Sequence, residues 1–167
     1  QGVPVVSVAA IVQHNTSSLL ALASSGIAGP ADLPGHRYGG WGGQLEEALV
    51  DRLVECADGD PAGVDFVQVG NTDYRVGMER GDFDFVWVYD GWDKLRLEQA
   101  GVDVTTIPFV DHLDCIPDWY TPLLATSQEL IDTDPDLVRA FVGVTSRGYD
   151  AAVADPGAAA TALLDAA

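Results

Sequence analysis

Short apolar runs alternate with amphipathic stretches along most of this chain. Apolar runs rich in β-branched and aromatic residues, bounded by glycine or polar clusters, predict strands at residues 3–12, 18–23, 64–69, 83–89, 102–108 and 120–126. Apolar residues at helical spacing predict helices at 45–56, 74–80, 93–100, 135–154 and from residue 156 onward. This alternation predicts an α/β fold with a parallel-type sheet flanked by helices.

Details of the pattern predict how some of these elements are placed. The run at residues 3–12 is apolar almost throughout, which predicts a buried strand. Asp134 followed by Pro135 predicts a capped helix start, and Pro122 predicts an edge or hinge position for its strand. The inward face of the helix at 45–56 is expected to comprise Leu45, Ala48, Leu49, Arg52, Leu53 and Cys56.

Residues 35–49 combine an extended piece, a glycine-dense turn and a helix start. Four of the five residues at 39–43 are glycine and the fifth is Trp41, while Glu46 and Glu47 occupy the first helical turn. Glycine permits positive φ angles and close approach of a ligand to the main chain, and the unpaired N–H groups of the helix start point back into the turn. The pattern is typical of a binding corner in an open α/β sheet. A tight turn with a packing tryptophan is the alternative interpretation.

Composition narrows the function classes. The 167 residues suffice for one ordinary domain, and 47% apolar with 20% charged residues indicates a globular chain. A formal charge of −18 with only 8 Lys and Arg argues against binding to nucleic acid or an anionic membrane. No apolar run approaches the roughly 20 residues that span a bilayer, and no export signal is visible at the start of the sequence.

Motifs for catalysis or metal binding are absent from the sequence. It contains no nucleophile elbow, phosphate-binding glycine loop or zinc-protease helix motif. The three histidines are dispersed, so neither a metal ligand set nor a catalytic residue is expected. Cys56 and Cys115 lie far apart with no ligand spacing, and although a disulfide is permitted, buried free thiols are the preferred interpretation.

Five stretches together resemble a known family. They are residues 4–17 (PVVSVAAIVQHNTS), 38–42 (YGGWG) followed by 46–48 (EEA), 85–89 (FVWVY) with 91–92 (GW), 118–122 (DWYTP) and 145–149 (TSRGY), while Gly43-Gln44 and Asp90 depart from the family pattern. In this order they resemble the solute-binding proteins of ABC transporters that carry thiamin pyrimidine precursors, and the related fungal thiamin-pyrimidine synthases. The resemblance covers nearly the whole chain.

The resemblance implies a periplasmic-binding-protein fold of type II, in which two lobes are joined by crossing strands. It places the crossing strands at residues 1–25, the second lobe at 26–108, and the return crossing with C-terminal helices of the first lobe at 109–167. Family members carry a further N-terminal part of the first lobe, so the chain is expected to be a fragment. The implied setting is extracytoplasmic, with an ABC permease as partner and no cofactor.

Candidate ligand-binding residues follow from the aromatic pattern and from the resemblance. Flat side chains beside a few polar groups suit a planar heterocycle, and a carboxylate can accept two hydrogen bonds from an aminopyrimidine edge. The set comprises Gln13, His14, Asn15, Tyr38, Gly40, Trp41, Gly42, Glu46, Tyr89, Asp90, Trp92, Asp114, Trp119 and Tyr120. Glu46 is equally well explained as a helix-start acid, and Trp87 is expected to pack in the core. Asp90 replaces an aromatic residue of the family, which bears on ligand identity.

Three functions remain open on the sequence. The first is non-catalytic capture of a thiamin pyrimidine precursor such as a formylaminopyrimidine for ABC-transporter uptake. The second is an enzyme like the fungal synthases, which needs a lysine for pyridoxal phosphate, a phosphate cradle and clustered cysteines; the only lysine here is Lys94. The third is a sensory ligand-binding domain. The first is the preferred hypothesis.

Overall fold

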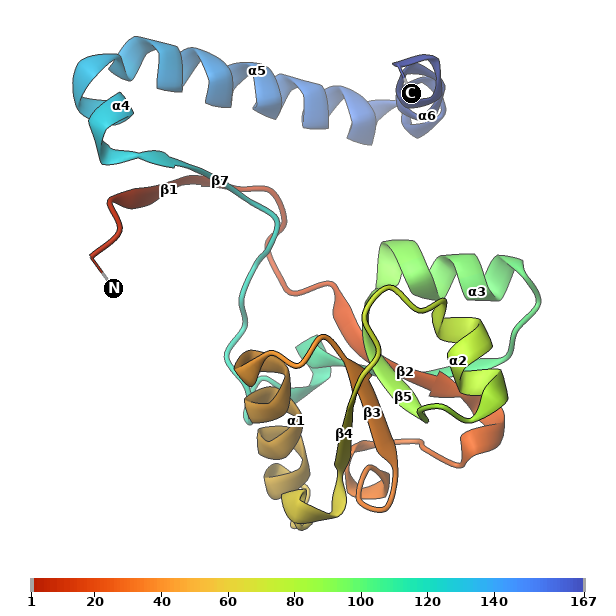
Figure 1. The fold of residues 1–167 in the computed structure, drawn as a ribbon. Coiled ribbons are helices and arrows are strands. Elements are labelled where there is room, and N and C mark those ends of the chain that lie inside the picture. Colours follow the sequence, from red (N-terminus) through yellow and green to blue (C-terminus); the bar gives the residue numbers. More distant parts are fainter. Residues whose placement is uncertain (1, 167) are drawn as a thin grey trace. The chain divides into compact units, whose positions relative to one another are not determined.

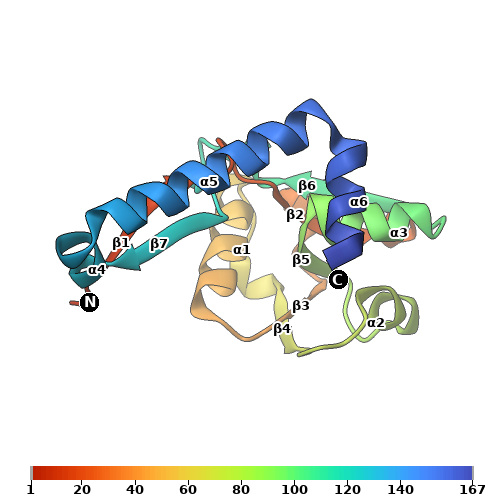
Figure 2. The same ribbon diagram turned by 90° about the horizontal axis from the view of Figure 1, so that it is seen from above.

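The structure, a computed structural model, describes residues 2–166, which divide into two compact units. The larger unit is His14–Tyr120, and the smaller unit combines the segments before and after it. Figures 1 and 2 give two views of the elements of each unit. The predicted α/β class with helices flanking a sheet is confirmed.

The larger unit contains a five-stranded mixed sheet with the order β4-β3-β5-β2-β6. Its strands are β2 (Ser17–Leu22), β3 (Arg37–Gly40), β4 (Asp65–Gln68), β5 (Phe85–Tyr89) and β6 (Val104–Pro108). β3 is parallel to both β4 and β5, as predicted, but β2 lies between β5 and β6 and is antiparallel to both. The prediction of parallel strands is therefore correct for β3, β4, β5 and β6, which all run in one direction, whereas β2, expected as a crossing strand between lobes, is antiparallel to both of its neighbours.

Helices cover both faces of this sheet. They are α1 (Gln44–Cys56), α2 (Tyr74–Arg80), the π-helical turn η4 (Asp90–Lys94) and α3 (Leu95–Gln99). Single turns occur at η1 (Ala23–Ser25), η2 (Pro30–Asp32), η3 (Pro61–Gly63) and η5 (Phe109–His112). Figure 1 shows α1 on one side of the strands and α2 and α3 on the other.

Alternation along β2 and β5 creates two cores. Successive side chains of a strand point to opposite faces, so Leu19 and Phe85 join the core under α1, while Leu20 and Val86 join the core under α2 and α3. All four side chains are at most 1% exposed. The larger unit is thus a three-layer arrangement with the sheet in the middle.

The face that helix α1 presents to the sheet includes the expected Leu49 and Leu53 but is otherwise displaced from the predicted one. The buried residues are Leu49, Val50, Leu53 and Val54, whereas Leu45 is 66% exposed and Ala48 is also exposed. Glu46 points into the glycine turn and bonds Tyr38 of β3. At 3.6 residues per turn, this orientation brings residues 49–50 and 53–54 onto the sheet, so the inward face is displaced from the predicted one.

The smaller unit pairs β1 (Val5–Ala10) with β7 (Leu123–Ser127) in an antiparallel ladder. Three helices follow, α4 (Gln128–Thr133), α5 (Pro135–Ala154) and α6 (Pro156–Ala166). The predicted cap is confirmed, since the Asp134 carboxylate accepts a hydrogen bond from the Leu137 amide at 3.0 Å. Helix α4 was not expected from the sequence; Ser127 caps it by accepting a hydrogen bond from Leu130.

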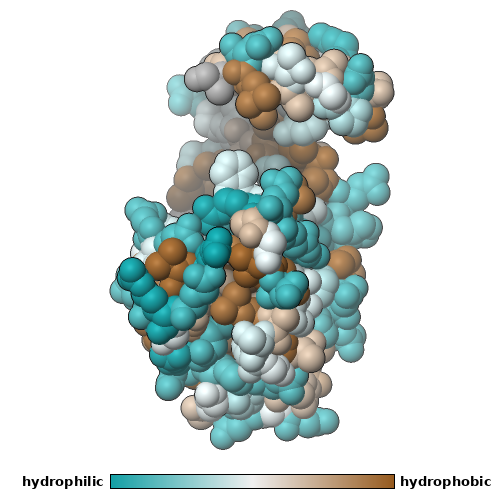
Figure 3. Space-filling view, turned by 90° about the vertical axis from the view of Figure 1, so that its right-hand side faces the viewer, coloured by the Kyte–Doolittle hydropathy of each residue, from teal (hydrophilic) through white to brown (hydrophobic). Residues whose placement is uncertain are grey.

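The expectation that residues 3–12 form a buried strand is wrong as to burial. Val3 and Val5 are 67% and 59% exposed, and Phe141 of α5 is 61% exposed. Within residues 2–166, every buried hydrophobic core residue belongs to the larger unit. Within residues 2–166, β1 has β7 as its single strand partner, so a strand apolar on both faces stays open to solvent. Figure 3 shows, in brown, that hydrophobic residues also occur elsewhere on the visible molecular surface.

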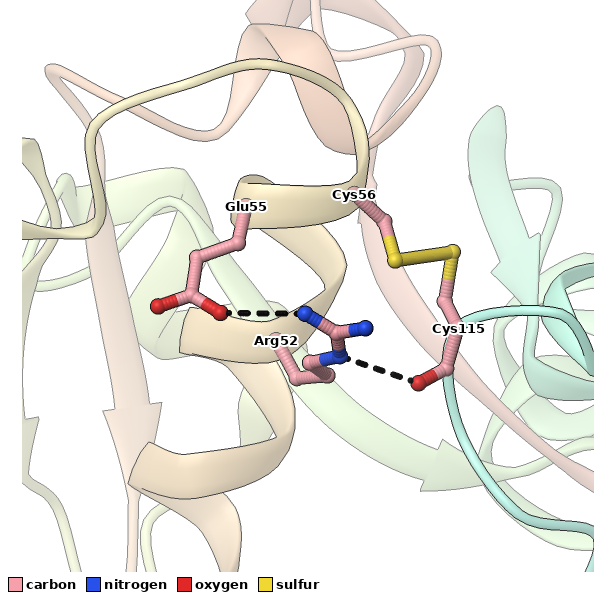
Figure 4. Close-up of a disulfide and its surroundings, with 4 residues drawn as sticks. All are labelled: Arg52, Glu55, Cys56 and Cys115. Carbon is pink, nitrogen blue, oxygen red and sulfur yellow. Dashed lines mark hydrogen bonds and ion pairs between the residues drawn. A yellow bond between two sulfur atoms is a disulfide. The ribbon is translucent and has the colours of Figure 1, made fainter.

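The two cysteines are bonded to each other, so the preference for buried free thiols is wrong. Cys56 ends α1 and Cys115 lies in the loop after η5, and their Cα atoms are 5.9 Å apart (Figure 4). Cys56 is exposed and Cys115 half-buried. The cysteines are 59 positions apart in the sequence, and the pairing could not be predicted because the fold, not local spacing, brings these segments together.

Candidate functional site

A hollow of about 340 Å³ lies where the parallel strands of the larger unit end. Its lining comes from the turn after β3, the starts of α1 and α2, the end of β5 and the η4 turn. The residues that line it are Trp41, Glu46, Tyr74, Trp87, Tyr89 and Asp93. We call it the aromatic hollow. The carboxyl edge of parallel strands is where open α/β sheets bind ligands.

Glu46 holds the glycine turn together. One carboxylate oxygen accepts hydrogen bonds from the Tyr38 hydroxyl at 3.0 Å and from the Trp41 amide at 3.2 Å. The other accepts from the Trp41 amide at 3.1 Å and from the Gly43 amide at 2.9 Å. Burial, followed by the nearby Glu46 charge, raises the pKa of Tyr38, so its hydroxyl stays a donor. Both oxygens of Glu46 are therefore engaged in positioning Trp41.

Two glycines of the turn have structural reasons for their identity. Gly42 has a φ of 80°, a conformation that L side chains rarely adopt. A Cβ at Gly40 would collide with the Tyr38 ring and lie 3.0 Å from a Glu46 carboxylate oxygen. The turn thus leaves the Trp41 indole 55% exposed beside the hollow.

Asp93 supplies a second carboxylate to the aromatic hollow. It belongs to η4, and burial raises its pKa, with Arg96 opposing the shift and Asp73 adding to it. Its contact with Arg96 is long, at 3.7 Å between the guanidinium nitrogen and Oδ1. Unlike Glu46, Asp93 keeps acceptor capacity for a ligand, because a carboxylate offers about four lone-pair sites.

The rear of the hollow is an aromatic cluster. The Trp87 ring centroid lies 5.2 Å from that of Phe109 and 5.7 Å from that of Trp119, both edge to face. The Trp87 indole nitrogen is buried and has no hydrogen-bond partner among residues 2–166. Ring packing therefore fixes the Trp87 side chain within the described chain. Trp87 lies both in the core, as expected, and on the wall of the hollow, which was not.

Three predicted ligand residues, Trp41, Glu46 and Tyr89, line the aromatic hollow together. Tyr38, Gly40 and Gly42 line a smaller adjoining cavity of about 100 Å³ with Glu46. Elsewhere, Asp90 accepts a hydrogen bond from the Ser18 hydroxyl at 2.7 Å. The other candidates lie outside both cavities: Gln13, His14, Asn15, Trp92, Asp114, Trp119 and Tyr120.

Sequence reasoning missed Tyr74 and Asp93, and underrated Trp87, as components of the hollow. Asp93 directly follows the Gly91–Trp92 motif, which was a usable signal. Tyr74 follows the helix cap Asp73, so the sequence could predict its position at the start of α2. It could not predict that Tyr74 lies beside Trp41 in the hollow. Burial raises the pKa of Tyr74, with hydrogen bonding to Trp41 as the opposing cause.

His14 and Asn15 are joined to Asp118 across more than 100 residues of sequence. Asp118 accepts a hydrogen bond from the Asn15 amide at 2.9 Å, and its second oxygen lies 2.7 Å from His14 Nδ1. The Asn15 side chain donates to the Trp119 carbonyl and accepts from the Ser17 amide. These contacts connect the first and last segments of the larger unit, and Asp118 was not among the predicted site residues.

Asp118→Asn is expected to lower the thermal midpoint by a few degrees near pH 6. The His14 hydrogen bond, then the Asn15 amide, lowers the pKa of Asp118 in the folded chain. Its ionised form therefore stabilises the fold above the unfolded pKa of about 4, and this contribution is lost as pH falls through the lowered folded pKa. Thermal melts from pH 6 to pH 2 should show the difference shrinking. Asp114→Asn is the control, and a difference independent of pH would refute the role of the charge.

The described residues contain no group of three or more His, Cys, Asp or Glu side chains that could hold a metal ion. Across the same part of the chain, no helix combines the length and apolar character needed to cross a bilayer.

The family model described as NMT1/THI5 like matches residues 1–159. The chain belongs to this family. It is 28% identical over 162 residues to the formylaminopyrimidine-binding protein of Halalkalibacterium halodurans, covering 96% of this chain and 48% of the relative. It is also 28% identical over 159 residues to a 4-amino-5-hydroxymethyl-2-methylpyrimidine phosphate synthase of Legionella pneumophila, covering 89% and 46%.

Solved structures agree on the fold. The periplasmic aliphatic sulphonate binding protein SsuA of Escherichia coli matches with a TM-score of 0.67 at 18% identity, covering 87% of this chain and 48% of that one. The ligand-binding component of an ABC-type import system from Staphylococcus aureus matches with a TM-score of 0.61 at 18% identity, covering 84% and 47%. The predicted type II periplasmic-binding-protein fold is confirmed. The chain spans about half the length of these relatives.

Proposed function

We propose that this NMT1/THI5-like chain is part of a solute-binding protein that captures a planar, donor-rich heterocycle, of the formylaminopyrimidine kind, for uptake through an ABC permease. The observation that carries the proposal is the aromatic hollow. Four aromatic side chains, Trp41, Tyr74, Trp87 and Tyr89, surround it, and Asp93 adds a carboxylate with free acceptor capacity. A flat ring can stack on such faces while a carboxylate accepts hydrogen bonds from its amine edge.

The charge of the hollow distinguishes this ligand class from sulfonates, for which several structural relatives are named. The lining of the hollow includes two carboxylates, Glu46 and Asp93, and no Lys or Arg. An anion placed there would face these acids in a chain of formal charge −18. A neutral or protonated aminopyrimidine meets no such penalty, and protonation would strengthen its bonds to Asp93.

A catalytic role receives less support. The synthase relative is 28% identical, the same as the binding-protein relative, so identity alone does not separate them. Cys56 and Cys115 are bonded to each other, so neither is available as a free thiolate in this state. An extracytoplasmic location agrees with the disulfide, because such bonds persist in oxidising compartments.

We also propose roles for the three segments of the chain and for candidate residues outside the aromatic hollow. Residues 1–25, 26–108 and 109–167 are proposed to serve the whole protein as crossing strands, second lobe and return crossing with first-lobe helices. Gln13, His14, Asn15, Asp90, Trp92, Asp114, Trp119 and Tyr120 are retained as candidates for contacts outside the aromatic hollow. Binding by two closing lobes would account for candidates on either side of a ligand.

Asp93→Asn is expected to weaken binding of formylaminopyrimidine by about tenfold or more. The change keeps the size of the side chain but removes its charge and one acceptor, and a charge-assisted hydrogen bond contributes ~1.5–3 kcal/mol. Titration calorimetry of the chain with formylaminopyrimidine measures the dissociation constant directly.

Asp65→Asn is the matched control, because it removes the same charge from an exposed position on β4. An alkanesulfonate serves as the competing ligand and is expected not to bind. Absence of formylaminopyrimidine binding at millimolar concentration, or tighter binding of the sulfonate, would contradict the proposed function.

A further inference from the structure

The Cys56–Cys115 disulfide joins the C-terminal end of α1 to the segment at residues 113–120, which we call the aromatic loop. A hydrogen bond also connects these two segments, because Arg52 of α1 donates from Nε to the Cys115 carbonyl at 3.2 Å (Figure 4). Arg52 also pairs with Glu55 at 3.3 Å. The disulfide therefore anchors one end of the aromatic loop to the helix that begins at the glycine turn.

The far end of the aromatic loop reaches the rear of the aromatic hollow. Trp119 packs edge to face against Trp87 and at a tilt against Phe109, each with ring centroids 5.7 Å apart, and Trp87 lines the hollow. Because the Trp87 indole nitrogen has no hydrogen-bond partner among the described residues, its orientation depends on these ring contacts. A continuous path of contacts thus runs from Cys115 through the loop to the wall of the hollow.

We propose that the Cys56–Cys115 disulfide positions Trp119 behind Trp87, so that ligand affinity at the aromatic hollow depends on whether this bond is intact. The inference rests on the proposed function of the hollow. Cys115 and Trp119 are positioning residues, since neither lines the hollow. Reduction by a dithiol transfers two electrons and two protons to the cysteine pair, giving two thiols while the reductant becomes a disulfide.

The positions of the two sulfurs suit such a dependence. Cys56 is exposed and Cys115 half-buried, so a small thiol can reach the bond. After reduction, the loop keeps other anchors: Ile116 is 3% exposed in the core, and Asp118 still holds Asn15. Cys115 packs against the core under α1, but neither cysteine is among the buried residues that form the two cores. We therefore expect a looser Trp119 in a folded unit instead of general unfolding.

The test compares the oxidised chain with the Cys56→Ala/Cys115→Ala variant, using formylaminopyrimidine as the probe. The expected result is a three- to tenfold weaker affinity by titration calorimetry at a temperature well below the thermal midpoint of both proteins. Near-ultraviolet circular dichroism should change in the tryptophan region, because the Trp87–Trp119 contact is loosened. A purely stabilising disulfide would lower the thermal midpoint but leave affinity and this spectrum unchanged at low temperature.

Two further variants keep the test decisive. Trp119→Leu retains the disulfide and should reproduce the loss of affinity; unchanged affinity would overturn the proposed path even if the double cysteine variant fails to fold. Glu55→Ala, which removes the neighbouring ion pair but not the disulfide, should bind like the parent chain. If the oxidised parent binds no formylaminopyrimidine, the proposed function fails, and an unaltered near-ultraviolet spectrum in the cysteine variant would independently overturn the positioning role.

Discussion

Trp41→Ala is expected to weaken binding of formylaminopyrimidine at least tenfold while leaving the larger unit folded. The Trp41 indole is 55% exposed and lines the aromatic hollow. Stacking of a heterocyclic base on an aromatic side chain contributes ~1–3 kcal/mol by alanine substitution. The backbone amide that Glu46 accepts from is kept in the variant. The loss should therefore come from the missing ring and not from a collapsed turn.

Calorimetric titration and a thermal melt on the same samples separate the two effects. Leu45→Ala is a suitable control, because Leu45 is 66% exposed on the adjoining helix and does not line the hollow. Equal affinity of the Trp41→Ala and parent chains would remove the glycine turn from the site. A large drop in thermal midpoint would mean that the indole is a structural residue after all.

Phe83→Ala should lower the free energy of unfolding of the larger unit by about 3–5 kcal/mol, the usual cost of deleting a fully buried aromatic ring. Phe83 is 0% exposed and lies between Gly39 of β3 and Gly77 of α2. A Cβ at Gly39 would approach the ring to 2.6 Å, and one at Gly77 would also collide with it. Two glycines thus create the space for this ring, and its removal leaves a cavity that rigid backbone on both sides cannot fill.

Urea denaturation followed by circular dichroism measures this loss. Phe141→Ala deletes the same side chain from α5, where it is 61% exposed, and should cost well under 1 kcal/mol. Comparable losses for the two variants would show that the space around Phe83 closes readily, contrary to the packing argument.

Local pattern was a reliable guide to the elements and to the glycine turn. The apolar periods predicted the ranges of α2, α5 and β5 closely, because amphipathic spacing and caps such as Asp73 and Asp134 act over a few residues. The turn before α1 was predicted from its glycines. The sequence left open whether Glu46 contacts a ligand or only stabilises the helix start. In the structure, both of its carboxylate oxygens accept hydrogen bonds from backbone amides and the Tyr38 hydroxyl.

Features that depend on residues distant in the sequence could not be predicted from local pattern. The antiparallel placement of β2, the exposure of β1 and the displaced face of α1 all follow from which partner each element meets. The disulfide joins residues 59 positions apart, and Asp118 meets His14 across 104. No short-range sequence pattern predicts contacts between residues so far apart.

By itself, the sequence determined the α/β class, the ranges of most elements, the acidic character and the family resemblance, because these depend on composition and short-range spacing. The tertiary structure alone decided that Trp41, Tyr74, Trp87, Tyr89 and Asp93 surround one hollow. It also decided that Trp119 supports that hollow from behind. The physical reason is that parallel strands bring their carboxyl ends to one edge, where side chains remote in sequence become neighbours.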